Sequence, residues 1–413
     1  MTTILLSCYR CDPDGVSEAY SGYKWAEALC ARNDVVLCVP GFVKDRVESA
    51  LRASVAGEYR VIGVEMLDID GSLGSFGSAV KPGFFIYESR LLRRIRRERL
   101  LEDVDLVWHR TPMSFRNRTR LHTLGKPLVI GPVGGGLRNP PQLASYFRRE
   151  GGLSLLRRFD AVLLGSRWWM RPFDEARCVI ATCDYVRDVL PSRLDAKTVT
   201  ILDVGIDTTP QPAMRAADTF TVLFVGRMVR YKGPELALEA FARFVKRLGS
   251  GAGTRLVMVG DGPELPELQR RAKDAGLDDV VVFTGRIPKG EVLEHYRRAD
   301  VFLFPSLTEA SGNVYLEAMN AGLPLVVVDN GGGRHIPDES CAIQVALGGE
   351  QSIIEGLANG LSALHEDEDM RQTMGSASRQ RVTTEFSWQV IGSRAASVVD
   401  EVVGASRPAG EGE

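Results

Sequence analysis

Short apolar runs alternate with segments of helical periodicity along the C-terminal half of the chain. The first run, Val222–Val225, ends in Gly226, and a helix is expected from Pro234, because proline is tolerated in the first helical turn. Apolar residues of that helix recur on one face at helical spacing. Further strands are expected at Leu256–Val259, Val280–Phe283, Val301–Phe304 and Leu325–Val328, and further helices at Leu265–Ala275, Val292–Ala299 and Asn313–Ala321.

The N-terminal half shows the same alternation less regularly. A helix is expected near Ser17–Ala31, and residues 67–83, rich in Gly and Ser, are expected to form a flexible loop. The expected strands are Ile4–Ser7, Val35–Val39, Val104–Trp108, Pro127–Ile130, Val179–Ala181 and Val199–Ile201.

Strands that alternate with helices predict an α/β fold with parallel, doubly wound sheets. We expect two Rossmann-like domains, because the Pro-containing segment near residue 210 reads as a linker and the charge balance changes there. The expected boundaries are 1–207 for the N-terminal domain, 208–218 for the linker and 219–385 for the C-terminal domain. A last helix is expected at 386–403, beginning near Ser387-Trp388, and a disordered tail at 404–413.

Composition excludes several classes of protein. The 413 residues are 44% hydrophobic and 25% charged, values typical of soluble globular proteins. No apolar run approaches the roughly 18 residues that span a bilayer, and the N-terminus lacks the basic region of a secretory signal. The seven scattered cysteines favour a reduced, cytoplasmic protein. Residues 1–200 carry 30 Lys and Arg against 23 Asp and Glu, whereas residues 201–413 carry 21 against 30, so the halves are expected to meet different partners.

Several common motifs are absent or incomplete. The sequence contains no P-loop, no zinc-protease motif and no nucleophile elbow, and Gly260-Asp261-Gly262 lacks the third glycine of a dinucleotide fingerprint. We expect no metal and no cofactor. Cys8 and Cys11 form a lone C-x-x-C pair, which we interpret as two incidental thiols at a strand end, since a redox or metal role would need a partner pair or a suitable His.

Two segments carry candidate chemistry. The first places Arg227 and Lys232 on the loop after Val222–Val225, where a doubly wound sheet opens its ligand crevice. Both cations suit phosphate, although a solvated basic loop is an equal alternative from spacing alone.

The second segment follows Val301–Phe304 and carries Glu309 on a loop and Glu317 in the next helix. Gly312 lets a ligand approach the backbone, and the free N–H groups of Asn313 and Val314 can receive a diphosphate. Carboxylates on either side of that anion site are able to hold hydroxyls of two sugars. A capping acid and a surface helix acid are the alternative for either residue alone, whereas a pair of acids flanking an anion site is less easily incidental.

In these segments the C-terminal half resembles the GT-B glycosyltransferases of family 4, which are retaining and use nucleotide sugars. The resemblance covers roughly residues 220–335 and rests on ordered motifs. They are Gly226-Arg227 with Lys232-Gly233, Val259-Gly260-Asp261-Gly262-Pro263, Val282-Phe283-Thr284-Gly285, Ala299–Ser306, and the Glu309/Glu317 pair running into Ala318–Pro324.

The resemblance implies a fold and a set of roles. Two parallel sheets would face each other across a cleft, with the acceptor side in 1–207 and the nucleotide-sugar side in 219–385, and the last helix would cross back to the N-terminal domain. Arg227 and Lys232 would neutralise the donor diphosphate, and Glu309 would hold the transferred sugar. Glu317 would bind the ribose. The backbone at Arg286 and Ile287 would contact the base, and the amides after Gly312 the phosphates.

The N-terminal half matches this family only in outline. His109 stands near a strand end where relatives have His, with a catalytic or a structural role as alternatives. The next strand runs into Gly134-Gly135-Gly136 where many relatives have a second His, and Gly15 matches the glycine-containing loop near the phosphates. Val204 and His335 replace residues common in the family, which indicates divergent specificity.

Six arginines lie within the ten residues Arg90–Arg99. A solvated helix face is the simpler interpretation, and peripheral contact with the inner face of an anionic membrane is the alternative. No nucleic-acid partner is expected, because interleaved aromatics are scarce and the net charge is −2. Trp168 and Trp169 are expected to be packed in the interior, with an acceptor pocket as the alternative.

Together these features predict a retaining hexosyltransferase, without a metal or a cofactor, that moves a sugar from a nucleotide diphosphate sugar to an acceptor hydroxyl. A natural product or aminocyclitol, a lipid carrier and a polysaccharide are the candidate acceptors. The alternatives are a GT-B phosphorylase or synthase, and a non-catalytic nucleotide-sugar-binding subunit.

Overall fold

Two parallel β-sheets organise the computed structural model, which describes residues 2–72, 81–149, 160–208, 214, 218–249 and 253–405. The chain divides into two units. Unit 1 comprises Met1–Gly136, Leu155–Gly205 and Trp388–Glu413, and unit 2 comprises Leu137–Ser154 and Ile206–Ser387. Of the described residues, 137–149 were predicted to be part of the N-terminal domain and instead group with the C-terminal one. Most of the predicted linker and of the predicted disordered tail lies outside the described residues.

Unit 1 contains a seven-stranded sheet in the order β3-β2-β1-β4-β5-β6-β7, with every neighbouring pair parallel. Its strands are β1 (Thr3–Cys8), β2 (Asp34–Pro40), β3 (Tyr59–Val64), β4 (Leu106–Thr111), β5 (Leu128–Val133), β6 (Cys178–Ala181) and β7 (Thr198–Thr200). Its helices are α1 (Glu18–Cys30), α2 (Lys44–Ser54), α3 (Ile69–Ser72), α5 (Pro82–Arg97), α7 (Asp160–Gly165), α8 (Arg167–Glu175), α9 (Asp184–Val189) and α17 (Trp388–Gly404).

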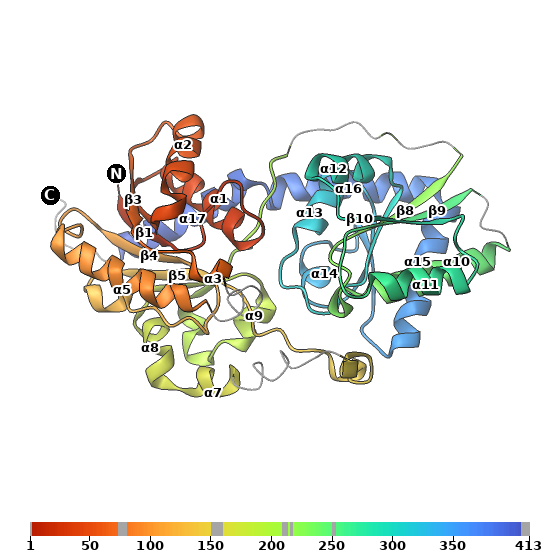
Figure 1. Ribbon diagram of the computed structural model, residues 1–413, viewed down its shortest axis with the longest axis horizontal. Coiled ribbons are helices and arrows are strands. Elements are labelled where there is room, and N and C mark those ends of the chain that lie inside the picture. Colours follow the sequence, from red (N-terminus) through yellow and green to blue (C-terminus); the bar gives the residue numbers. More distant parts are fainter. Residues whose placement is uncertain are drawn as a thin grey trace. The chain divides into compact units, whose positions relative to one another are not determined.

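Unit 2 contains a six-stranded sheet in the order β10-β9-β8-β11-β12-β13, again parallel throughout. Its strands are β8 (Phe220–Val225), β9 (Thr254–Val259), β10 (Val281–Gly285), β11 (Val301–Phe304), β12 (Leu325–Val328) and β13 (Ala342–Val345). Its helices are α10 (Pro234–Leu248), α11 (Leu265–Asp274), α12 (Lys289–Arg298), α13 (Asn313–Asn320), α14 (Gly332–His335), α15 (Glu350–Glu366) and α16 (Glu368–Glu385). Figure 1 shows helices on both faces of this sheet, with α10, α11 and α15 on one side and α12 and α13 on the other.

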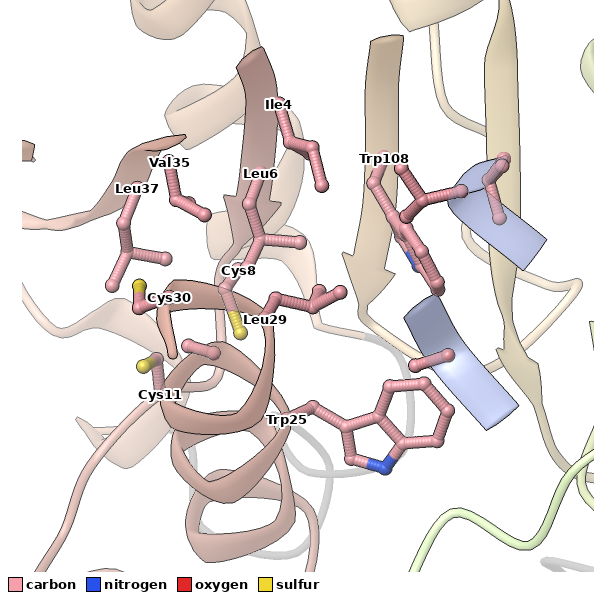
Figure 2. Packing of buried hydrophobic residues seen from close by; sticks show 14 of the residues in the cluster. Ile4, Leu6, Cys8, Cys11, Trp25, Leu29, Cys30, Val35, Leu37 and Trp108 are labelled. Carbon is pink, nitrogen blue, oxygen red and sulfur yellow. The ribbon is translucent and has the colours of Figure 1, made fainter. Parts of the chain in front are cut away.

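The core of unit 1 lies between its central strands and the helices α1 and α17 (Figure 2). Trp25 of α1 and Trp108 of β4 pack with ring centroids 6.1 Å apart. Each indole N–H also finds a backbone acceptor, Asp203 O at 2.9 Å and Gly131 O at 2.8 Å respectively. Because both rings are buried and hydrogen bonded, they fix α1 against the middle of the sheet.

The two-unit α/β architecture agrees with the predicted fold class, and three local expectations were wrong. The strand predicted at Val104–Trp108 runs later, as Leu106–Thr111, so His109 lies inside it. The predicted loop 67–83 contains α3 and the start of α5, because buried Asp70 accepts hydrogen bonds from Tyr9 Oη and from the amide of Gly83. Trp168 is 67% exposed instead of interior. Residues 73–80 of that loop lie outside the described part of the chain.

Candidate active site

Each sheet changes its direction of strand addition at one point, between β1 and β4 in unit 1 and between β8 and β11 in unit 2. Ligands of doubly wound sheets bind beyond the carboxyl ends of the strands at such a point. In unit 2 the loop after β8 carries Arg227 and Lys232, and the loop after β11 carries Glu309. The topology therefore brings the two predicted segments to one edge of one sheet.

Glycines hold the loop after β8 against the loop after β9. Gly260 has φ +132°, and a Cβ there would lie 2.0 Å from Gly226 O, so the position requires glycine. The amide of Met228 donates to Asp261 O at 2.9 Å, and the amide of Glu264 donates to Met228 O at 3.0 Å. These contacts fix the backbone that presents the exposed side chain of Arg227.

The loops after β8 and β11 are joined directly. The amide of Leu307 donates to Tyr231 O at 2.8 Å. Gly233 has φ +68°, and a Cβ there would lie 2.3 Å from Pro305 O. A side chain at Gly233 would therefore push the start of α10 away from the end of β11, and the glycine permits the close approach on which the site depends.

Lys232 and Glu309 form an ion pair across this junction, and both side chains are largely buried. The Lys232 Nζ also lies 5.5 Å from the ring centroid of Phe304. Burial, together with the charge of Arg227, lowers the pKa of Lys232 to about 8. Contact with Glu309 opposes that shift, because a carboxylate favours the charged ammonium. A cation and an acid are thus held together where the sheet opens.

The N-terminus of α13 begins beside Glu309. Gly312, with φ +131°, precedes the helix, and no side chain caps it. Among the described residues, the backbone N–H groups of Asn313 and Val314 have no recorded acceptor, as expected for a first helical turn. These free donors and the positive end of the helix can receive an anion.

Glu317 lies half-buried in the second turn of α13. Burial raises the pKa of this carboxyl, while a hydrogen bond from Tyr296 and the charge of Lys289 favour its ionised form. Tyr296 Oη lies 3.1 Å from Glu317 Oε2 and 3.4 Å from Val314 O, and the ring is 1% exposed. Tyr296 therefore fixes the orientation of Glu317, a role that the sequence analysis did not identify.

Arg286 and Ile287 directly follow β10. The amide of Gly260 donates to Gly285 O at 3.0 Å, which places the end of β10 next to the glycine loop after β9. Arg286 is exposed and Ile287 is half-buried. Both remain predictions as base contacts.

Unit 1 contains the predicted residues Gly15 and His109 and the glycines 134–136. Gly15 lies in the loop between β1 and α1, where a Cβ would approach Ala19 Cβ to 2.8 Å. His109 is 3% exposed, and burial lowers the pKa of its imidazole to about 4, so the ring is neutral at physiological pH. Gly135 and Gly136 adopt φ +98° and +76° in a turn, and these positive values explain why both residues are glycines. A catalytic role for His109 stays a prediction.

A contact between Tyr146 and Arg230 could not be predicted from the sequence. Tyr146, from the segment that groups with unit 2, donates from Oη to Arg230 O at 3.0 Å, and the Arg230 guanidinium lies 4.8 Å from the centroid of its ring. Arg230 also pairs with Glu235 and Glu264, at 3.2 and 3.3 Å. This cluster steadies the turn that carries Lys232. Within the described ranges, no group of three or more His, Cys, Asp or Glu is arranged to hold a metal ion.

Comparison with known proteins identifies the family to which the chain belongs. Residues 206–381 match the family described as glycosyl transferases group 1. The chain is 30% identical over 273 residues to a GDP-mannose-dependent alpha-(1-6)-phosphatidylinositol monomannoside mannosyltransferase of Mycobacterium tuberculosis, covering 62% of this chain and 68% of that protein. It is 32% identical over 180 residues to a D-inositol 3-phosphate glycosyltransferase of Kribbella flavida, covering 42% of this chain and 41% of that protein.

Solved structures support the fold. HepE (Alr3699) of Anabaena, crystallised with UDP, gives a TM-score of 0.63 at 17% identity, covering 97% of this chain and 100% of that one. A glycosyltransferase of Rickettsia africae gives a TM-score of 0.64 at 16% identity, covering 97% and 98%. The chain therefore belongs to the glycosyl transferases group 1 family and is a glycosyltransferase with the GT-B fold.

Proposed function

We propose that the protein is a retaining glycosyltransferase of family 4 that moves a hexose from a nucleotide diphosphate sugar to an acceptor hydroxyl. The observation that carries this proposal is the junction of the loops after β8 and β11. There the Lys232–Glu309 ion pair lies beside the uncapped N-terminus of α13. Cationic, acidic and backbone N–H groups in one place match a substrate that has both a diphosphate and sugar hydroxyls.

The chemistry follows from charge development. Glycosyl transfer builds positive charge on the sugar ring and negative charge on the departing diphosphate. Arg227, Lys232 and the amides of Asn313 and Val314 stabilise the negative charge without a metal ion. Glu309 holds hydroxyls of the sugar, and Glu317 holds those of the ribose. The bond from the anomeric carbon to the acceptor oxygen forms as the bond to phosphate breaks, and the acceptor proton passes to the leaving phosphate.

Relatives indicate which substrates to test first. The mycobacterial relative is named for GDP-mannose and a phosphatidylinositol mannoside, the Kribbella relative for inositol phosphate, and a further relative is a glycogen synthase. HepE was crystallised with UDP. Nucleotide release is therefore measured for UDP-, GDP-, ADP- and dTDP-sugars, with and without inositol-containing, lipid-linked and oligosaccharide acceptors. Acceptor-dependent release with one donor supports the proposal, and binding without release would favour a non-catalytic subunit.

Tyr296→Phe is expected to weaken donor binding while leaving kcat within about twofold. The phenol hydroxyl orients Glu317, so its loss should raise the donor KM about tenfold, or about 1.4 kcal/mol. Discrimination between ribose and 2′- or 3′-deoxyribose donors should shrink as well, because Glu317 would no longer be held against those hydroxyls. Tyr59→Phe in β3 is the matched control. Equal discrimination in the variant and the parent protein would contradict this role.

We also propose that α5 contacts an anionic membrane surface. Arg93 and Arg96 are exposed on this helix, and Phe85 and Ile86 are 39% and 40% exposed nearer its start. Basic and apolar side chains on the exposed part of one helix suit a membrane interface. In the described part of the chain, no helix is long and apolar enough to cross a bilayer.

Reversing two charges tests that contact. Arg93→Glu with Arg96→Glu should weaken binding to vesicles of phosphatidylglycerol and phosphatidylcholine at least about tenfold in a sedimentation assay, at roughly 1 kcal/mol for each basic residue. Lys246→Glu with Arg255→Glu changes two exposed cations of unit 2 as a matched control. Equal binding by both double variants would show that α5 is only a solvated face.

A further inference from the structure

A cluster of thiols lies at the point in unit 1 where the sheet changes its direction of strand addition. Cys8 ends β1, Arg110 and Thr111 end the adjacent β4, and Cys11 lies in the loop between β1 and α1. Figure 2 shows the sulfur atoms of Cys8, Cys11 and Cys30 gathered beside α1. Neither the proposed transfer reaction nor the proposed donor site uses this cluster.

The two cysteines of the C-x-x-C pair are in contact. The two thiols influence each other's pKa, and the Cys8 thiol lies within donating distance of Arg10 O, 3.4 Å away in the loop between the two cysteines. A Cβ at Gly22 of α1 would lie 2.0 Å from Arg10 O, so glycine allows the loop between the cysteines to rest directly on the helix. The Thr111 hydroxyl lies 3.5 Å from Cys8 Sγ, which gives that sulfur a second neighbouring donor.

Arg110 supplies a buried positive charge to the same pocket. Its side chain is fully buried, and its Nη2 donates to Ser21 Oγ at 2.6 Å. Its Nε and Nη1 make no hydrogen bond to any residue that the structure describes. A buried guanidinium with two unpaired N–H groups is costly unless an anion balances it. The neighbouring groups whose negative charge offsets that of Arg110 are Cys8, Asp203 and Glu18.

The charge states of the thiols follow from these contacts. Burial alone would raise the pKa of Cys8, but the hydrogen bond from Cys11 and the charge of Arg110 hold it below its ordinary value. Donation to Cys8, and then burial, raise the pKa of Cys11. Burial raises the pKa of Cys30 and of Cys178 to about 12. Cys8 therefore ionises most readily of these thiols, and the thiolate is the nucleophilic form of cysteine.

We propose that Cys8 and Cys11 are a redox-active dithiol that hydrogen peroxide converts to a disulfide. The Cys8 thiolate attacks one peroxide oxygen, which breaks the O–O bond and leaves a Cys8 sulfenic acid and hydroxide. The Cys11 sulfur then attacks the Cys8 sulfur, so the S–S bond forms and the S–O bond breaks. The two thiols lose two electrons and two protons, and the peroxide becomes two water molecules. Because both sulfurs are buried, oxidation is slower than at an exposed thiol.

Arg10 gives the reaction a direct test, since trypsin cleaves between the two cysteines. Full-length protein is treated with hydrogen peroxide, its free thiols are alkylated under denaturing conditions, and the tryptic peptides are examined by mass spectrometry. We expect peptides 1–10 and 11–24 to be joined, and dithiothreitol to separate them. Cys30→Ser should still give the joined pair. Cys11→Ser should instead accumulate a Cys8 sulfenic acid that dimedone traps.

Two results would overturn the proposal. One is the absence of joined peptides after peroxide treatment of protein that keeps its native circular dichroism spectrum. The other is oxidation of Cys178, in the buried strand β6, at the same rate as Cys8, because that would report unfolding instead of a reactive pair. Neither result depends on the proposed donor site, since the readout is the covalent state of the thiols.

Discussion

Replacing Glu309 by alanine is expected to lower kcat/KM for sugar transfer about a thousandfold, or about 4 kcal/mol, while leaving the fold intact. The carboxylate lies on a loop at the edge of the sheet and pairs with Lys232, so its removal disturbs the site and not the core. The hydrogen bonds that we propose between this carboxylate and the sugar hydroxyls should strengthen as charge develops in the transition state. The measurement is steady-state kinetics on the donor and acceptor that the screen identifies.

Two further variants make the Glu309 result specific. Glu309→Gln keeps the size of the side chain and removes its charge, so a comparable loss would assign the effect to charge. Glu366→Ala, at an exposed position of α15, is the control for removing an acid from unit 2. Wild-type turnover by Glu309→Ala with a normal melting temperature would refute the assignment of this residue.

Replacing Lys232 by methionine should raise the donor KM about a hundredfold and also reduce kcat. The methionine side chain fills similar volume beside Phe304 but removes the positive charge that we propose pairs with the donor diphosphate. Lys246→Met, at an exposed position of α10, is the control. Unchanged donor affinity and turnover in Lys232→Met would exclude a role in phosphate recognition.

The pH dependence gives a second readout of Lys232. The ammonium is charged below its pKa of about 8 and neutral above it. Since kcat/KM reports the free enzyme, this parameter for the donor should fall as the pH rises through about 8 in the parent protein. This decrease of kcat/KM at alkaline pH should be missing in Lys232→Met. An identical decrease in both proteins would show that another group is responsible for it.

The site in unit 2 could be predicted because its parts are local in sequence. Glu309, Gly312 and Glu317 lie within one loop and the helix that follows it, and Gly233 directly follows Lys232. The sequence shows a strand, then a loop, then the beginning of a helix. This order places the residues at a sheet edge before any tertiary contact is known. Edge strands β3 and β13 were not predicted, because their partly exposed positions interrupt the apolar runs on which strand prediction relies.

Contacts between distant segments could not be predicted in this way. Tyr296 and Glu317 are separated by 21 positions, and Tyr146 and Arg230 by 84. The C-x-x-C pair was interpreted as incidental because neither a partner pair nor a suitable His is evident in the sequence, and the buried Arg110, on another strand, is not recognisable there as its neighbour. Each of these pairs depends on which strands become neighbours, and periodicity within one segment carries no such information.

The sequence by itself determined that this chain is an α/β protein with two parallel sheets, and which loops carry acids, cations and the required glycines. Backbone periodicity and glycine placement are local properties, so they are legible along the chain. Only the tertiary structure decided the strand order, the pairing of Lys232 with Glu309, the hydrogen bond that orients Glu317 and the position of Arg110 beside Cys8. These features arise when side chains far apart in the sequence are desolvated together, and their charges and hydrogen bonds must then be satisfied by one another.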